Sequence, residues 1–223
     1  AIAGISRLKE FFAHPVEDQG ATDDLTLTAP PLVIDDAAFS YGSESIFRHL
    51  SLSVKTGEIV TITGRTGAGK STLFKLILGL YAPKEGTIRV FGCKPADLSP
   101  ALRRQVFGYV EQQFHDVAGT VGDQVTLKDP RVSEEAVEKA LRLVGLWDLC
   151  SALPEGLETP FRQEFFSRGQ LQLLSIARAV VMNPRILLDE ITANLDALTE
   201  QQVLTALQAA SQNRTVLSIS HRL

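Results

Sequence analysis

The sequence predicts an α/β fold whose mainly parallel sheet is built around a phosphate-binding loop. Residues 64–72 contain glycine, four residues and then glycine-lysine-serine, which is the pattern of such a loop. A run rich in β-branched residues at 58–63 precedes it and predicts a buried strand. Apolar residues at helical spacing follow it: Leu73, Leu76, Ile77 and Leu80. A strand, a glycine loop and a helix N-terminus form an anion site, because backbone N–H groups and the helix dipole both favour negative charge there.

Each part of this loop has a physical role in binding a nucleoside triphosphate. Its glycines let the backbone close around phosphate oxygens with no Cβ in the way. The Lys70 ammonium can reach the β- and γ-phosphates, and the Ser71 hydroxyl can ligate Mg²⁺. The alternative is a glycine-rich turn that binds nothing, and the strand and helix around the loop disfavour it. The full loop comprises Gly64, Arg65, Thr66, Gly67, Ala68, Gly69, Lys70, Ser71 and Thr72.

Strand and helix patterns on both sides of the loop complete the predicted architecture. A small antiparallel sheet is expected from short strands at 32–34, 38–41, 50–54 and 87–91. Further strands at 106–111, 186–190 and 215–220 alternate with helices, which favours a parallel core. Residues 113–182 are expected to form a helical subdomain. Its clearest signals are the N-cap Ser133 and the stop at Asn183-Pro184.

Composition and charge describe an ordinary soluble globule of 223 residues, 44% hydrophobic and 22% charged. The net charge of −4 gives no attraction to nucleic acid, so no nucleic-acid partner is expected. Cys93 and Cys150 provide neither a disulfide framework nor metal-ligand spacing, and we interpret both as packing residues in a reducing compartment. No apolar run approaches the roughly 20 residues that span a bilayer.

The first 28 residues are interpreted as a lead-in, and residues 29–223 as the domain proper. Apolar residues share one helical face up to Pro15, which ends that helix. The acidic, turn-rich stretch that follows is typical of a linker. The amphipathic piece is either a membrane-surface helix or the tail of a preceding domain, and we favour the second. Because the chain begins at Ala1 rather than Met, we expect it to be a piece of a longer protein.

Polar residues at the carboxyl ends of the predicted strands are candidates for nucleotide chemistry, since ligands of such sheets bind there. Asp189 follows an apolar strand and can hold Mg²⁺ beside Ser71. Glu190 can polarise an attacking water as a general base. The Gln112 amide can contact Mg²⁺ or that water, and His221 ends the last strand. Taken singly, each has a plainer interpretation as a strand end or a loop residue.

In order and approximate spacing, these residues resemble the nucleotide-binding domain of ABC transporters over residues 30–223. The matching pieces are Tyr41, the loop at 64–72, Gln112, Phe166-Ser167-Arg168-Gly169-Gln170, Asp189-Glu190, Ala193-Asn194-Leu195-Asp196 and His221. An aromatic such as Tyr41 can stack on a nucleobase. Taken alone, it is better interpreted as a core or edge aromatic.

The resemblance implies ATP and Mg²⁺ as cofactors and a role for each matching position. Tyr41 would stack on adenine, and Lys70 would hold the β- and γ-phosphates. Ser71 and Asp189 would place Mg²⁺, and Glu190 would activate water. Gln112 would sense Mg²⁺ and couple to a membrane domain, while His221 would contact the γ-phosphate as a switch.

The resemblance also implies a partner domain. Two ATPase domains would meet head to tail, with ATP between the phosphate loop of one and the signature stretch, residues 166–170, of the other. Ser167, Gly169 and Gln170 would then bind the partner's γ-phosphate at the start of the following helix. Asp196 would lie at the dimer seam.

Three features depart from the family pattern. The signature is usually Leu-Ser-Gly-Gly-Gln, whereas here Phe166 and Arg168 occupy its first and third positions, and the cation either crowds the nucleotide or adds positive charge. The strand before Asp189 has three apolar residues where four are usual. A one-residue slip in a strand turns its side chains to the opposite face of the sheet. The missing residue must therefore be compensated near Arg185, or a residue is absent from the sequence. The chain also stops at Leu223, where the family continues, and therefore looks truncated.

Residues 5–12 resemble the join between membrane helices and the ATPase domain in exporter-type transporters. We therefore expect an exporter ATPase domain on the cytoplasmic side of the cell membrane, which hydrolyses Mg-ATP to drive a transmembrane domain. One alternative is a soluble ABC ATPase of DNA repair or translation, disfavoured by the lead-in and by the lack of a basic patch. The other is a nucleotide-binding regulatory module with little hydrolysis. Glu190 and His221 argue against it, and Arg168 leaves it open.

Overall fold

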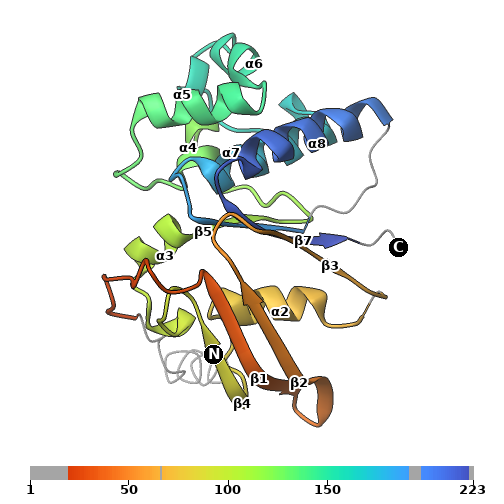
Figure 1. Cartoon of the computed structure of the whole chain (residues 1–223). Coiled ribbons are helices and arrows are strands. Elements are labelled where there is room, and N and C mark those ends of the chain that lie inside the picture. The colour runs from red at the N-terminus through yellow and green to blue at the C-terminus, as the bar shows by residue number, and fades with distance from the viewer. Residues whose placement is uncertain (1–19, 66, 191–196, 221–223) are drawn as a thin grey trace, which may run out of the picture.

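The computed structural model describes residues 20–65, 67–190 and 197–220. A parallel sheet lies across the middle of the molecule, an antiparallel sheet lies below it, and a group of helices lies above it (Figure 1). The parallel sheet has the strand order β3 (Ile59–Thr63), β7 (Thr215–Ser220), β6 (Ile186–Asp189) and β5 (Phe107–Val110). The antiparallel sheet has the order β2 (Glu44–Val54), β1 (Leu32–Tyr41) and β4 (Glu85–Arg89).

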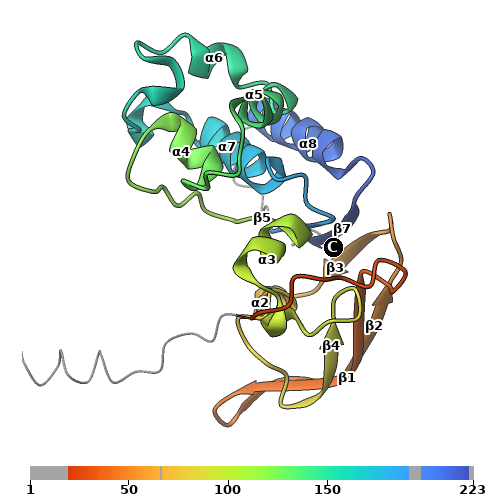
Figure 2. The ribbon, with the colours of Figure 1, turned by 90° about the vertical axis from the view of Figure 1, so that its left-hand side faces the viewer.

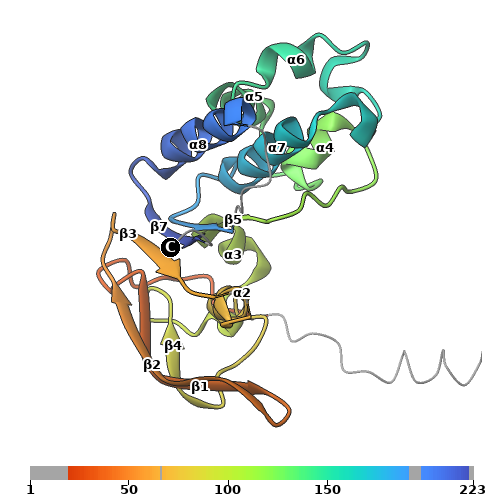
Figure 3. The same cartoon turned by 90° about the vertical axis from the view of Figure 1, so that its right-hand side faces the viewer.

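Helices cover both faces of the parallel sheet. One helix, α2 (Lys70–Ile77), lies between the two sheets (Figure 3). The helical group contains α4 (Val121–Thr126), α5 (Glu134–Leu143), α6 (Trp147–Ser151), α7 (Arg168–Val180) and α8 (Ala197–Ser211). The remaining elements are α3 (Pro100–Val106) and the 3-10 turns η1 (Pro95–Asp97), η2 (Gly156–Glu158) and η3 (Gln163–Phe165). Within these described parts of the chain, no helix has the length and apolar run that a bilayer span requires.

All strands of the central sheet are parallel, as the alternation of strands and helices predicts. The pairs β3–β7, β6–β7 and β5–β6 each run in the same direction. Their carboxyl ends therefore lie at one edge of the sheet. The phosphate loop follows β3 at this edge, and the Asp189-Glu190 pair ends β6 there.

The side chains of β6 alternate between two apolar clusters, one on each face of the sheet. Leu188 belongs to the cluster that contains α2 and the antiparallel sheet. Leu187 belongs to the cluster formed with α7 and α8. Because successive side chains of a strand point to opposite faces, neighbouring residues of β6 face different helices. This alternation decides where the two carboxylates at the end of β6 point.

The helix after the phosphate loop is shorter than predicted. It ends at Ile77, and Leu80, which we expected on the buried stripe, is 52% exposed. Gly79 adopts the left-handed conformation with φ 77°, and the Leu80 N–H donates to the Lys75 carbonyl at 2.9 Å. This is the geometry of a glycine-terminated helix end, in which the chain leaves the helical path.

Other local features also differ from the sequence-based expectations. The strands predicted at 32–34 and 38–41 form one strand, β1, because irregular pairing with β2 carries it across the polar stretch between them. The short helix α3 was not predicted, although Ser99 caps it by accepting a hydrogen bond from the Leu102 N–H at 3.1 Å. In the helical group, Ser133 caps α5 as predicted.

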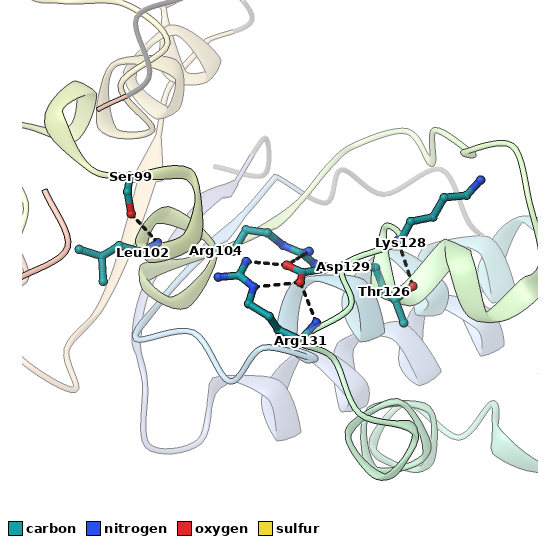
Figure 4. A network of polar contacts seen from close by, with 7 residues as sticks. All are labelled: Ser99, Leu102, Arg104, Thr126, Lys128, Asp129 and Arg131. Carbon is teal, nitrogen blue, oxygen red and sulfur yellow. Dashed lines mark hydrogen bonds and ion pairs between the residues drawn. The ribbon is translucent and has the colours of Figure 1, made fainter. Parts of the chain in front are cut away.

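A network of polar contacts joins α3 to the segment that follows α4 (Figure 4). Arg104 donates to the Asp129 carboxylate at 2.6 Å and to the Thr126 carbonyl at 3.0 Å. Arg131 donates to the same carboxylate at 2.6 and 2.9 Å. The Asp129 side chain is only 8% exposed. The side-chain hydrogen bond from Arg131 is the main reason why the pKa of Asp129 is held well below its usual range. Figure 2 shows α3 beneath the helical group, so this network links the group to the rest of the domain.

Replacing Asp129 with asparagine should lower the free energy of unfolding by about 1–3 kcal/mol, because charge-assisted hydrogen bonds from two arginines are lost. The folded state binds the Asp129 proton less tightly than the unfolded state, so the carboxylate stabilises the fold above the unfolded pKa of about 4. The difference between wild type and Asp129→Asn in thermal melts should shrink as the pH falls below that value. Glu85→Gln, at an exposed carboxylate of β4, is the control and should change stability little at any pH. Equal melts for Asp129→Asn and wild type at neutral pH would show that the network is not stabilising.

Candidate nucleotide-binding site

The phosphate loop has the backbone geometry that its glycines permit. Gly64, Gly67 and Gly69 have φ values of 155°, 82° and 84°, all unfavourable for residues with a Cβ. Gly69 is required for a second reason, since a Cβ there would collide with Ile46 and Phe47 of β2. Gly69 is also the N-cap residue of α2. The loop is therefore shaped by its own glycines and by close packing against β2.

The Lys70 side chain lies over the loop. Its ammonium donates to the carbonyls of Gly64 at 2.7 Å and Arg65 at 2.9 Å, and the residue is only 7% exposed. The N-terminus of α2 adds unpaired N–H groups and a positive dipole end at the same place. A cation, helix N–H groups and an open glycine loop together suit a polyphosphate.

The carboxylate of Glu190 faces this loop. One of its oxygens accepts a hydrogen bond from the Ser71 hydroxyl, and the other accepts from the Tyr109 hydroxyl at 2.6 Å. Glu190 is 6% exposed. Burial, reinforced by this hydrogen bond, raises the pKa of Tyr109 well above its usual range, so the phenol remains a donor at neutral pH. A hydroxyl and a carboxylate oxygen side by side are ligands of the kind that Mg²⁺ takes together with phosphate oxygens.

The carboxylate of Asp189 points elsewhere. It accepts a hydrogen bond from the Ser218 hydroxyl of β7 at 3.1 Å and is 8% exposed. Ser218 lies directly opposite Asp189 in the pairing of β6 with β7. The residue we expected to hold Mg²⁺ beside Ser71 is thus next to β7, and the residue expected to activate water is next to Ser71.

Tyr41 lies beside the first turn of α2. Its hydroxyl is 3.5 Å from the Thr72 hydroxyl, and its ring is in edge-to-face contact with Phe39 at 5.0 Å and Tyr81 at 5.5 Å. Tyr41 is nevertheless 39% exposed. Tyr41 therefore belongs to an aromatic cluster and still offers surface to a ligand.

The signature stretch begins α7, far from the phosphate loop of its own chain (Figure 1). Ser167 and Gln170 form a reciprocal capping box: the Gln170 amide oxygen accepts from the Ser167 N–H at 2.8 Å, and the Ser167 hydroxyl accepts from the Gln170 N–H at 3.2 Å. Phe166 is buried and stacks on Phe161 with ring centroids 5.5 Å apart. The first unusual signature position is therefore a packing residue, whereas Arg168, the second, is exposed.

The structure describes only some of the other residues that we expected at the site. Gln112 is exposed in the loop after β5, at the same sheet edge as the phosphate loop. Thr66, His221 and Asp196 lie outside the described residues. Sequence reasoning missed Tyr109, which donates to Glu190, and Ser218, which donates to Asp189. The capping box at Ser167 was visible in the sequence as serine followed three residues later by glutamine.

The fold and this loop define a nucleotide-binding protein of the phosphate-loop class, and comparisons with known proteins specify the family. The family model described as ABC transporter matches residues 47–193. A probable multidrug resistance ABC transporter ATP-binding/permease protein of Bacillus subtilis (strain 168) is 37% identical over 192 residues, 84% of this chain and 28% of that protein. The alpha-hemolysin translocation ATP-binding protein of Escherichia coli O157:H7 is 34% identical over 224 residues, 98% of this chain and 32% of its own length.

A solved structure of a bacterial Atm1-family ABC exporter with ATP bound is similar over 99% of this chain and 40% of that one, with a TM-score of 0.81 and 31% identity. The chain belongs to the ABC transporter family, whose ATP-binding domains hydrolyse ATP to drive transport. It spans about a third of the length of the curated relatives that it matches.

Proposed function

We propose that this chain is the ATPase domain of an exporter-type ABC transporter, which binds Mg-ATP and couples its hydrolysis to movement of a transmembrane domain. The observation that carries the proposal is the phosphate loop between β3 and α2, with Lys70 over it and a buried carboxylate against Ser71. When bound, Mg²⁺ would neutralise the charge that develops on the phosphate oxygens. Ser71 and a carboxylate of the β6 end would hold it.

The transmembrane partner is inferred from the relatives. One of those described above is an ATP-binding/permease protein and the other is a translocation ATP-binding protein, and each is about three times as long as this chain. Their names favour transport over DNA repair or translation. Within this proposal the domain works at the cytoplasmic face of a membrane and pairs head to tail with a second ATPase domain. The exposed start of α7 would then face the partner's nucleotide.

ATP affinity of Tyr41 variants tests the nucleotide contact. Tyr41→Ala should weaken ATP binding about threefold to tenfold, whereas Tyr41→Phe should preserve it, because stacking uses the ring and not the hydroxyl. Binding can be followed by titration calorimetry. Tyr81→Ala removes another partly exposed ring of the same cluster and should change the affinity less. If the alanine and phenylalanine variants of Tyr41 bind ATP equally, Tyr41 only packs, and if wild type binds no ATP the proposed function fails.

A further inference from the structure

The strand β6 differs in length from the pattern of the family, and the proposed function does not explain this difference. With three apolar residues before Asp189, the strand is one residue shorter than the pattern of the family it resembles. We expected the shortening either to be absorbed near Arg185 or to reflect an absent residue. Instead, β6 pairs with both β5 and β7 without a bulge from Ile186 to Asp189. Arg185 already takes part in the same ladder, since its N–H donates to Gln105 and its carbonyl accepts from Thr215.

A regular ladder determines the direction of both carboxylates. Leu188 packs with α2, and Leu187 packs with α7 and α8. Side chains alternate along an extended chain, so Asp189 falls on the face of Leu187 and Glu190 on the face of Leu188. The backbone of Glu190 continues this extended path, because its N–H donates to the Val110 carbonyl at 3.0 Å.

The hydrogen bonds of the two carboxylates agree with their placement on opposite faces of the sheet. Glu190 bonds to Ser71 of α2 and to Tyr109, whose ring is in edge-to-face contact with Phe74 of α2. Asp189 bonds to Ser218, on the same face as Val216 of the other cluster. Neither carboxylate can exchange its position with the other without a one-residue slip of β6 against both neighbouring strands, which would reverse every side chain of the strand.

We propose that Glu190, and not Asp189, is the carboxylate on the metal side of this nucleotide site, while Asp189 is a positioning residue between β6 and β7. This assignment rests on the proposed nucleotide function. It follows that the general-base role which the family resemblance implies for Glu190 is not the role of this carboxylate. Tyr109 would orient it by donating to the oxygen that Ser71 does not use.

Metal binding to isosteric variants tests the assignment. Mn²⁺ in place of Mg²⁺ can be titrated by electron paramagnetic resonance in the presence of ATP, which requires no turnover. Glu190→Gln should weaken Mn²⁺ binding at least about tenfold, since a charged ligand is lost. The matched control Asp189→Asn should stay within about twofold of wild type, because the amide oxygen can still accept from Ser218. Circular dichroism melts establish that both variants are folded.

The two assignments predict opposite results for the same pair of variants. If Asp189 holds the metal and Glu190 is the base, Asp189→Asn loses Mn²⁺ affinity and Glu190→Gln retains it, and the proposal is overturned. ATP affinity measured with EDTA separates this failure from failure of the proposed function. Binding of ATP without metal in all three proteins leaves the function intact whichever variant loses Mn²⁺.

Insertion of one leucine between Leu188 and Asp189 provides an independent test. The longer strand should return the aspartate to the α2 face and turn the glutamate away from it. In that background the aspartate-to-asparagine change should weaken Mn²⁺ binding and the glutamate-to-glutamine change should not. An insertion variant that is folded and still depends on its glutamate would contradict the role of strand register.

Discussion

Lys70→Ala should weaken ATP binding by about tenfold to a hundredfold, because a charge-assisted contact to the β- and γ-phosphates is lost. The ammonium lies over the loop, within 2.9 Å of two of its carbonyls, so a bound polyphosphate would meet this cation first. Titration calorimetry with ATP gives the affinity. A loss of turnover should accompany the loss of affinity.

Lys75→Ala is the matched control for this prediction. Lys75 lies on the same helix and is exposed near its C-terminal end, so the variant removes the same charge away from the loop. It should bind ATP as wild type does. Because Lys70 is buried, melts of Lys70→Ala must show a folded protein before its affinity is interpreted. Unchanged ATP binding in a folded Lys70→Ala variant would remove the basis of the proposed function.

Mixing two defective variants should restore ATP-dependent pairing that neither shows alone. In a head-to-tail dimer each nucleotide lies between the loop of one chain and the signature of the other. Lys70→Ala removes loop function, and Ser167→Glu places a negative charge where the partner's γ-phosphate would lie. A dimer of one chain of each kind retains one intact composite site, built from the loop of the Ser167→Glu chain and the signature of the Lys70→Ala chain.

Energy transfer between fluorescent labels on the chain termini measures this pairing. With Mg²⁺ and a hydrolysis-resistant ATP analogue, transfer should appear in the mixture and not in either variant alone. Ser133→Glu is the control, because Ser133 also caps a helix through its hydroxyl but lies outside the signature. It should lose a similar cap energy of about 1 kcal/mol and still pair with itself. Self-pairing of Ser167→Glu at the level of Ser133→Glu would contradict the head-to-tail site.

The nucleotide site could be predicted from the sequence where its physics is local. The loop at 64–72 needs only a preceding strand, glycines that tolerate positive φ, and a helix that begins at Lys70, and all three are encoded within about 20 residues. The caps at Ser133 and Ser167 are local for the same reason: each hydroxyl bonds a backbone N–H three residues away. The parallel order of the core strands followed from their alternation with helices.

The direction of Asp189 and Glu190 depended on the tertiary structure. The sequence placed both carboxylates at the end of one strand. The face of the sheet on which each carboxylate lies depends on the register of β6 against β5 and β7, and these two strands are distant from β6 in the chain. The partners Tyr109 and Ser218 come from those two strands, so neither contact has a signal in the residues around the pair. Side-chain facing in a strand has a period of two, so a change of one residue in length leaves the residue types intact and exchanges their surroundings.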